Sequence, residues 1–341
     1  MTRLTPTYEG VISVHPITTN HDTMRLAVER HEFPPPSGSS ATARIAFLWS
    51  HGSGFHKELL HPLMRRFIER LRSKSVYEST HIDFIAWDNR THGDSARLNH
   101  EYLDQYKVLW FDLAMDTLQV IRKMALGKEG YDKLIGVAHS IGASTMLLAE
   151  FIQPNIFDGI CIMEPVIRNW ALGPAEVGRY PLITSTLKRQ DTWPDREACR
   201  KTLRKNPVWR KLHPEALENY VNYGLYDTDE GKVKLKCPKK QESLLSQGAT
   251  YDAYTSCMSL KMVSIPVHAV LCKQPMIDVT ARSHPEDIGA QSAMVTVCVI
   301  DGWHTLPAED PDRLVPEIER LTEVVLCNKE NDKKNFRESR L

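Results

Sequence analysis

Short apolar segments of strand length alternate with amphipathic segments of helix length along most of this chain. Six segments have the apolar character and length of buried strands, at residues 43–50, 81–88, 132–140, 158–166, 265–272 and 294–300. Helix-length segments with apolar residues every three or four positions lie between or after them, at 58–73, 108–126, 141–152 and 311–327. This alternation predicts a parallel sheet covered by helices on both faces. Two further strands, at 10–17 and 25–33, are expected to form an antiparallel edge of a mostly parallel eight-stranded sheet.

The alternation stops once, between Ile167 and Lys261. This segment is rich in predicted helix and is interrupted by several prolines, so we interpret it as a helical cap inserted between two strands of the sheet. The expected organisation is an α/β core at 1–167 and 262–330, a helical cap at 168–261, and a flexible tail at 331–341.

The composition argues against several classes of protein. Lys and Arg number 43 and Asp and Glu also number 43, whereas a nucleic-acid-binding protein needs a basic surplus. We find neither a transmembrane segment nor a secretory signal. The seven cysteines include no C-x-x-C pair and the fourteen histidines include no H-E-x-x-H. The chain is therefore expected to occupy a reducing compartment, with no metal and no redox cofactor.

Ser140 lies in AHSIG, residues 138–142, where a predicted strand meets a predicted helix. A serine between small residues at such a junction is typical of a nucleophile elbow, usually G-x-S-x-G, with Ala138 here in place of the first glycine. The turn would expose the serine hydroxyl at the carboxyl edge of the sheet, where binding sites gather. A strand that merely ends in a turn is the alternative, because so short a motif often arises by chance.

Two other loops supply candidates for the rest of such a site. WSHGSGF, at 49–55, follows a predicted strand, and the N–H of Ser53, or next of Gly54, could stabilise an oxyanion together with the N–H of Ile141. His304, in DGWHTLP, follows the last predicted strand, where it could take the proton of the serine.

The loop WDNRTHGDS, at 87–95, follows another predicted strand. We expect its His92 and Ser95 to be structural residues that hold this loop beside the nucleophile.

Taken in order along the chain, these four segments resemble the α/β-hydrolase superfamily, and the resemblance covers roughly residues 40 to 327. The resemblance implies an α/β-hydrolase fold with Ser140 as nucleophile and His304 as base, and it places the cap at the family's usual point of insertion. Residues beside these motifs are expected to contact the substrate, namely Gly54, Phe55, His139 and Trp303.

The acid of the triad has two candidates. In most of the family it follows the seventh strand, where this chain has Pro275, and the nearest carboxylate is that of Asp278. Glu164 ends an earlier apolar strand, and a glutamate in that position needs a partner such as His304 to offset its desolvation. We choose Glu164, with Asp278 as the alternative.

The sequence ends in Ser339, Arg340 and Leu341, which resembles the peroxisomal address S-K-L and implies an import receptor as a partner. Together with IMEPVI (162–167) and HPEALENYVNYGLYD (213–227), this tripeptide makes the chain similar to fungal peroxisomal serine hydrolases. That group includes hydrolases of toxin biosynthesis, a yeast lipase-like protein, and the acyl-CoA hydrolase of the mycophenolic acid pathway, whose acid follows the sixth strand as Glu164 does.

The expected function is therefore hydrolysis of an acyl-CoA thioester in the peroxisome, within fungal secondary metabolism. Arg196, Arg200 and Arg204 recur every four residues, and we expect Arg200 and Arg204 to contact the phosphates of coenzyme A, with a solvated helix face as the alternative. A carboxylesterase or lipase acting on a neutral ester, and a ligand-binding protein without turnover, also stay open. The identity of the acyl group and the oligomeric state, for which a homodimer is one alternative, also stay open.

Overall fold

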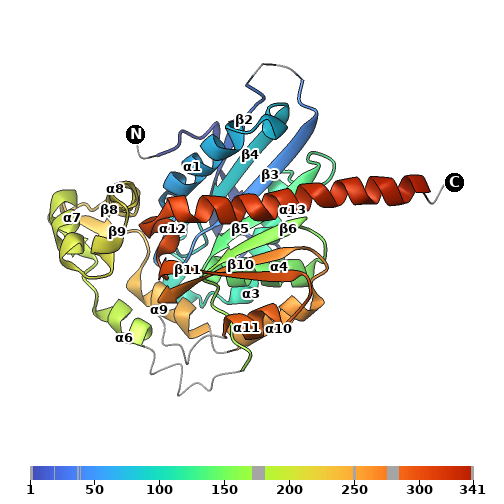
Figure 1. The fold of residues 1–341 in the computed structure, drawn as a ribbon. Helices are drawn as coiled ribbons and strands as arrows, with labels where there is room; N and C mark the ends of the chain where they lie inside the picture. Colours follow the sequence, from blue (N-terminus) through green and yellow to red (C-terminus); the bar gives the residue numbers. More distant parts are fainter. Residues whose placement is uncertain are drawn as a thin grey trace.

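The computed structural model describes residues 3–18, 20–36, 38, 40–170, 181–248, 251–274 and 284–338. An eight-stranded sheet forms its centre, in the order β1-β2-β4-β3-β5-β6-β10-β11 (Figure 1). The strands are β1 (Tyr8–Ser13), β2 (Arg25–Phe33), β3 (Ala43–Ser50), β4 (Thr80–Trp87), β5 (Lys133–His139), β6 (Gly159–Met163), β10 (Val267–Gln274) and β11 (Val295–Trp303). Strand β2 runs antiparallel to both of its neighbours, and the other pairs are parallel. The predicted mostly parallel sheet with an antiparallel edge is confirmed.

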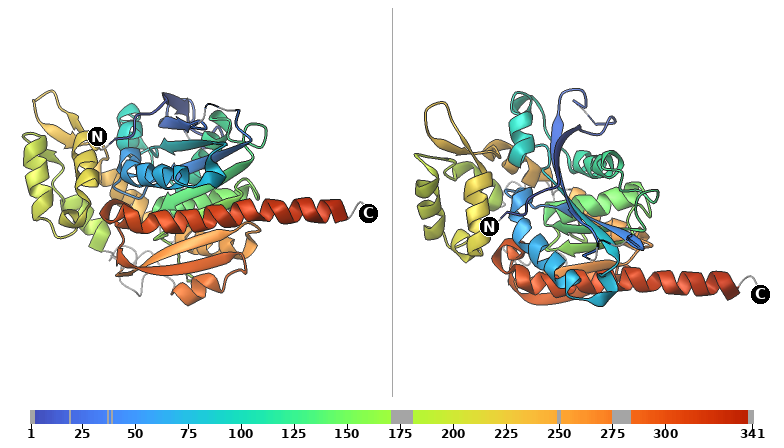
Figure 2. Two further views of the ribbon diagram at one scale, coloured as in Figure 1. Left: turned by 45° about the horizontal axis from the view of Figure 1, so that its top comes forward. Right: turned by 90° about the horizontal axis from the view of Figure 1, so that it is seen from above.

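Helices cover both faces of this sheet, as the right-hand view of Figure 2 shows. Helices α1 (His61–Arg72) and α13 (Pro311–Glu338) share one apolar core with the sheet, and α3 (Trp110–Lys123), α4 (Ile141–Ile152) and α10 (Asp252–Ser259) share the other. The shorter helices of the core are α2 (Gly93–Leu98), α11 (Pro285–Gly289) and α12 (Leu306–Glu309). Single 3₁₀ turns lie at Lys57–Leu59, Ser75–Tyr77, Leu103–Gln105, Trp209–Lys211 and Leu260–Met262.

Most of the chain between β6 and β10 forms a separate layer beside the carboxyl edge of the sheet. Its elements are α6 (Pro181–Lys188), β7 (Thr192–Trp193), α7 (Arg196–Lys205), α8 (Pro214–Tyr223), β8 (Leu225–Asp227), β9 (Val233–Leu235) and α9 (Lys239–Gln247). The insert therefore contains a three-stranded antiparallel sheet, β7-β9-β8, as well as the predicted helices. Strands of two or three residues are too short to show a periodic pattern. Helix α10 packs against α4 of the core rather than against this sheet.

Helix α13 continues to Glu338, eleven residues beyond its expected end at Cys327. It thus includes most of the segment that its polar composition predicted to be flexible. Half of its residues from 331 to 338 are Lys, Arg or Glu, which are good helix formers. None of the described helices is long and apolar enough to cross a membrane.

Candidate active site

Ser140 occupies a sharp turn between β5 and α4, with φ 55° and ψ −123°. A positive φ is strained for a residue with a side chain. The turn is held by a 2.9 Å hydrogen bond from the Ser140 N–H to the Met163 carbonyl. A Cβ atom on Gly142 would lie 2.5 Å from the His51 carbonyl oxygen, so only glycine fits there. These sterics explain the small residues around Ser140, and the turn has the form of a nucleophile elbow.

Ser140, His304 and Glu164 form a hydrogen-bonded chain at the carboxyl edge of the sheet. The Oγ atom of Ser140 lies 2.8 Å from Nε2 of His304, and Nδ1 of His304 lies 3.2 Å from Oε2 of Glu164. All three side chains are buried. In this arrangement the imidazole donates from Nδ1 to the carboxylate, which leaves Nε2 free to accept the serine proton.

The carboxylate of Glu164 is held in place by the neighbouring strand β10. Its Oε1 accepts a 2.5 Å hydrogen bond from the N–H of Cys272, and the Glu164 N–H donates to the Val270 carbonyl at 2.8 Å. Glu164 itself has φ 46°, so the chain leaves β6 in a strained turn that directs the side chain to His304. The alternative acid, Asp278, and the neighbouring Pro275 lie outside the described residues.

The loop after β3 lies beside Ser140. A Cβ atom on Gly52 would come within 3.0 Å of the Ser140 Cβ. No described residue accepts a hydrogen bond from the N–H of Ser53 or Ile141, as an oxyanion site requires. The N–H of Gly54, in contrast, donates to Nε2 of His92 at 2.8 Å. The Gly54 N–H is therefore already bonded, and the Ser53 N–H is the better candidate for an oxyanion donor.

His92 and Ser95 hold this region together, as we expected of them. Nδ1 of His92 donates to Oδ1 of Asn89 at 2.8 Å, and burial holds the pKa of His92 well below its usual value. The neutral ring can therefore accept the Gly54 N–H. The hydroxyl of Ser95 accepts from the Ala27 N–H at 2.8 Å and donates to the Asp88 carbonyl at 2.7 Å, which joins this loop to β2.

His139 connects the loop that contains His304 to the elbow through a hydrogen bond. Its Nε2 donates to the His304 carbonyl at 2.6 Å, and burial lowers the pKa of His139 to about 3, so the ring stays neutral. The ring also stacks on Phe55, with 5.6 Å between centroids. His139 thus has a positioning contact that the motif alone did not indicate.

Lys57, which follows the loop after β3, is a buried lysine that no pattern in the sequence indicates. Nζ of Lys57, a residue only 3% exposed, lies 2.7 Å from Glu58, 3.1 Å from Asp88 and 2.6 Å from Asp94. Although burial lowers it, the carboxylates raise the pKa of Lys57 well above its usual value. In the sequence Lys57 and Glu58 look like any solvated charge pair, and no local pattern distinguishes them.

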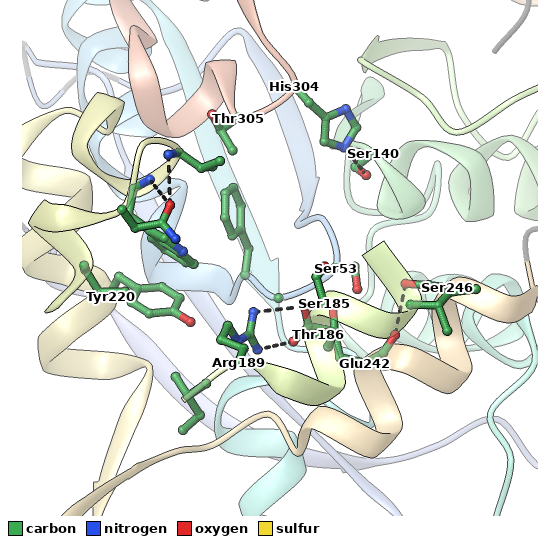
Figure 3. A pocket seen from close by; sticks show the side chains of 18 of the residues that line it. Ser53, Ser140, Ser185, Thr186, Arg189, Tyr220, Glu242, Ser246, His304 and Thr305 are labelled. Carbon is green, nitrogen blue, oxygen red and sulfur yellow. Dashed lines mark hydrogen bonds and ion pairs between the residues drawn. The ribbon is translucent and has the colours of Figure 1, made fainter. Parts of the chain in front are cut away.

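A cavity of about 830 Å³ lies between the sheet edge and the inserted layer (Figure 3). Ser140 and His304 line it together with Ser53, Gly54, Phe55, His139 and Ile141, all of which the sequence analysis had selected. The insert contributes further lining residues, among them Arg189, Trp193, Trp209, Tyr220 and Glu242.

The structure does not bring Arg200, Arg204 or Trp303 into the lining of this cavity. Arg200 donates to both carboxylate oxygens of Glu218 at 2.8 Å, and Arg204 lies 3.9 Å from the same carboxylate. The helical face that the spacing predicted therefore exists, but acidic residues on it and on α8 neutralise it. The Trp303 ring instead lies below Nζ of Lys211, 3.1 Å from its centroid.

Two other lysines line the cavity where it opens to solvent. Lys188, at the end of α6, and Lys205, at the end of α7, are both exposed. Neither ammonium group has a carboxylate partner in the part of the chain that the structure describes. The opening therefore carries two unneutralised positive charges.

Among the described residues, the buried group of Glu29, His31 and His61 has the composition of a metal site. The hydrogen bonds of His61 are not those of a metal ligand. Nδ1 of His61 accepts the Leu4 N–H at 3.2 Å, so its Nε2 carries a proton and donates to Glu29. His31 lies 3.1 Å from the same carboxylate oxygen. We assign the group as a structural hydrogen-bond network.

Comparison with known proteins agrees with this fold. A sequence profile described as "Alpha/beta hydrolase family" matches residues 47–317. This chain belongs to the alpha/beta hydrolase family. This alpha/beta hydrolase is 27% identical over 199 residues to a type I acyl-CoA thioesterase, mpaH, of Penicillium roqueforti. The match covers 57% of this chain and 40% of that protein.

It is also 26% identical over 223 residues to the peroxisomal membrane protein LPX1 of Saccharomyces cerevisiae, covering 60% of this chain and 56% of that protein. The chain spans about half the length of these curated relatives. Among solved structures, the peroxisomal alpha-beta-hydrolase Lpx1 of the same yeast superposes with a TM-score of 0.77 at 19% identity, over 96% of this chain and 91% of that one. That likeness confirms the alpha/beta hydrolase fold.

Proposed function

We propose that this protein is a serine hydrolase that cleaves an acyl ester or thioester. The observation that carries the proposal is the chain of hydrogen bonds from Ser140 through His304 to Glu164. Ser140 and His304 line a cavity that is large enough for an acyl group. Membership in the alpha/beta hydrolase family and the names of its relatives support a hydrolase.

In this mechanism Oγ of Ser140 attacks the acyl carbon while Nε2 of His304 takes its proton. The N–H groups of Ser53 and Ile141 bind the oxyanion of the tetrahedral intermediate. The intermediate collapses to an acyl-enzyme, and the thiol or alcohol leaves with the proton from His304. Water activated by His304 then releases the acid and restores Ser140. Throughout, Glu164 holds the tautomer of the imidazole and stabilises its positive charge.

An acyl-CoA thioester is the substrate class that we favour. The relatives named acyl-CoA thioesterases support it, as do Lys188 and Lys205 at the opening, where the phosphates of coenzyme A would lie. A neutral ester is the alternative, since the rest of the lining is largely apolar. A set of acyl-CoAs and matched ethyl esters, assayed for hydrolysis with the purified protein, tests the proposal. Hydrolysis of neither set would favour a ligand-binding protein without turnover.

Replacing both Lys188 and Lys205 with glutamine is expected to raise KM for an acyl-CoA about fivefold to tenfold at low salt, with little change in kcat, because a remote phosphate contact is lost equally in ground and transition states. KM for the matched neutral ester should not change. Michaelis–Menten kinetics at two ionic strengths measure both effects, since salt should weaken only the phosphate contact.

The matched control replaces Arg200 and Arg204 with glutamine on the neighbouring face of α7. Because Glu218 already neutralises these arginines, KM for both substrates should stay unchanged. A larger effect from the arginine pair than from the lysine pair would restore the helical face as the phosphate site.

We propose further that the protein acts in the peroxisome, in fungal secondary metabolism. One relative, the yeast protein LPX1, is named peroxisomal both by its sequence match and by its solved structure. Ser339, Arg340 and Leu341 form a tripeptide that an import receptor could bind, although these three lie outside the described residues. A fluorescent protein that carries residues 330–341 should collect in peroxisomes on microscopy, and removal of Leu341 should release it to the cytosol. A diffuse signal from the intact tail would contradict this location.

A further inference from the structure

One wall of the cavity is a continuous series of aromatic rings that leads away from Ser140. His139, beside the serine, stacks on Phe55. The Phe55 ring lies 6.5 Å from that of Trp209, which in turn lies 4.2 Å from that of Tyr220. All four residues line the cavity. An acyl group attached to Ser140 can therefore extend along this wall toward Tyr220.

The wall ends in a hydroxyl group that lacks a partner. Tyr220 is 2% exposed, yet its hydroxyl has no hydrogen-bond partner among the residues that the structure describes. Figure 3 shows it pointing toward Arg189. Burial raises the pKa of Tyr220, so the hydroxyl keeps its proton. The hydroxyl oxygen is not among the polar atoms that are fully buried without a partner, and Tyr220 lines the cavity. A ligand oxygen in the cavity can therefore reach it and accept its hydrogen bond.

Arg189 lies beside Tyr220, but it adds no net charge to the cavity. Its guanidinium donates to Oε1 and Oε2 of Glu242 at 3.2 and 2.5 Å. Its Nε is fully buried, so the Tyr220 hydroxyl is the donor that a ligand can reach here. A substrate carboxylate here would lie close to Glu242 without a cation of its own, which is unfavourable in a buried site. A neutral oxygen acceptor avoids that repulsion.

We infer that the Tyr220 hydroxyl, beside the neutral ion pair of Arg189 and Glu242, forms a subsite for a neutral oxygen atom, a carbonyl or hydroxyl group, on the far part of the substrate's acyl group. The inference rests on the proposed function, because the acyl group is taken to start at Ser140. The preferred substrate is then an oxygenated acyl ester or thioester rather than a plain fatty acyl chain. The aromatic wall binds its apolar part, and the Tyr220 hydroxyl determines which end group is accepted.

Binding measurements test this subsite without requiring turnover. The probes are three ethyl amides of equal chain length that carry a methyl group, a ketone or a carboxylate at the far end. By calorimetry, the wild-type protein should bind the ketone about tenfold more tightly than the other two, as expected for one added neutral hydrogen bond. Tyr220→Phe should lose this preference and bind the methyl-ended amide unchanged.

Tyr223→Phe, on the same helix but outside the cavity lining, is the matched control and should keep the preference. Equal affinity of the wild-type protein for the ketone and methyl probes would overturn the subsite, as would an equal loss for both probes in Tyr220→Phe. Tighter binding of the carboxylate probe would overturn the neutral assignment. Hydrolysis of the matching thioesters is scored separately, so a protein that shows the ketone preference without turnover retains the subsite and loses the proposed function.

Discussion

Replacing Ser140 with alanine is expected to lower kcat by roughly 10⁴- to 10⁶-fold, because no other group in the site can form the acyl-enzyme. The protein should stay folded, since the hydroxyl's one contact is with His304 and alanine keeps the Cβ atom in the strained turn. Kinetics on the best substrate of the hydrolysis assay measure the loss. Thermal unfolding monitored by circular dichroism checks the fold.

A fluorophosphonate probe should label the wild-type protein at Ser140, as identified by peptide mass spectrometry, and should fail to label the alanine variant. Ser144→Ala is the matched control one turn further along α4. The Ser144 hydroxyl is buried and donates to the Val166 carbonyl at 2.9 Å, so its loss should affect stability modestly and leave kcat within a few fold. Retention of a tenth of wild-type turnover by Ser140→Ala would rule out Ser140 as the nucleophile.

Replacing Glu164 with glutamine is expected to lower kcat about 10³- to 10⁴-fold, the second-largest effect. The Cys272 N–H holds an oxygen at the Oε1 position, so the new amide must turn its NH₂ group toward His304. Nδ1 of His304 would then accept a hydrogen bond, and the ring proton would move to Nε2. In that tautomer Nε2 cannot take the proton of Ser140, and no carboxylate stabilises the imidazolium.

Asp278→Asn is the comparison that distinguishes the two candidate acids. It should change kcat by only a few fold if Glu164 is the acid, and kcat measured for both variants at saturating substrate decides the point. A greater loss from Asp278→Asn would return the acid to its usual place after the seventh strand of this sheet. Circular dichroism of both variants separates a catalytic loss from unfolding.

Local patterns in the sequence predicted the strands and helices of the core well. The buried strand at 43–50 and the helix at 141–152 have the predicted bounds, because their apolar patterns are long enough to distinguish a strand from a helix. The small residues around Ser140 reported the tight elbow, since their reason is steric and local. The two-residue and three-residue strands of the insert carried no such pattern.

Side-chain partners were harder to predict, because they come from distant parts of the chain. Arg200 and Arg204 do share a helix face, but Glu218 from α8 neutralises it. Gly54 follows the expected H-G motif, yet its N–H is taken by His92, 38 residues further along.

The sequence by itself therefore determined the order of strands and helices, the steric form of the elbow, and the selection of Ser140, His304 and Glu164 as residues at strand ends. These features depend on periodicity and backbone sterics, which act over a few residues. Only the tertiary structure decided that Glu164 reaches His304, that Lys57 is buried among three carboxylates, and that Tyr220 faces a cavity. Electrostatic and hydrogen-bond partners depend on distance in space, and residues more than a hundred positions apart become neighbours only when the sheet assembles.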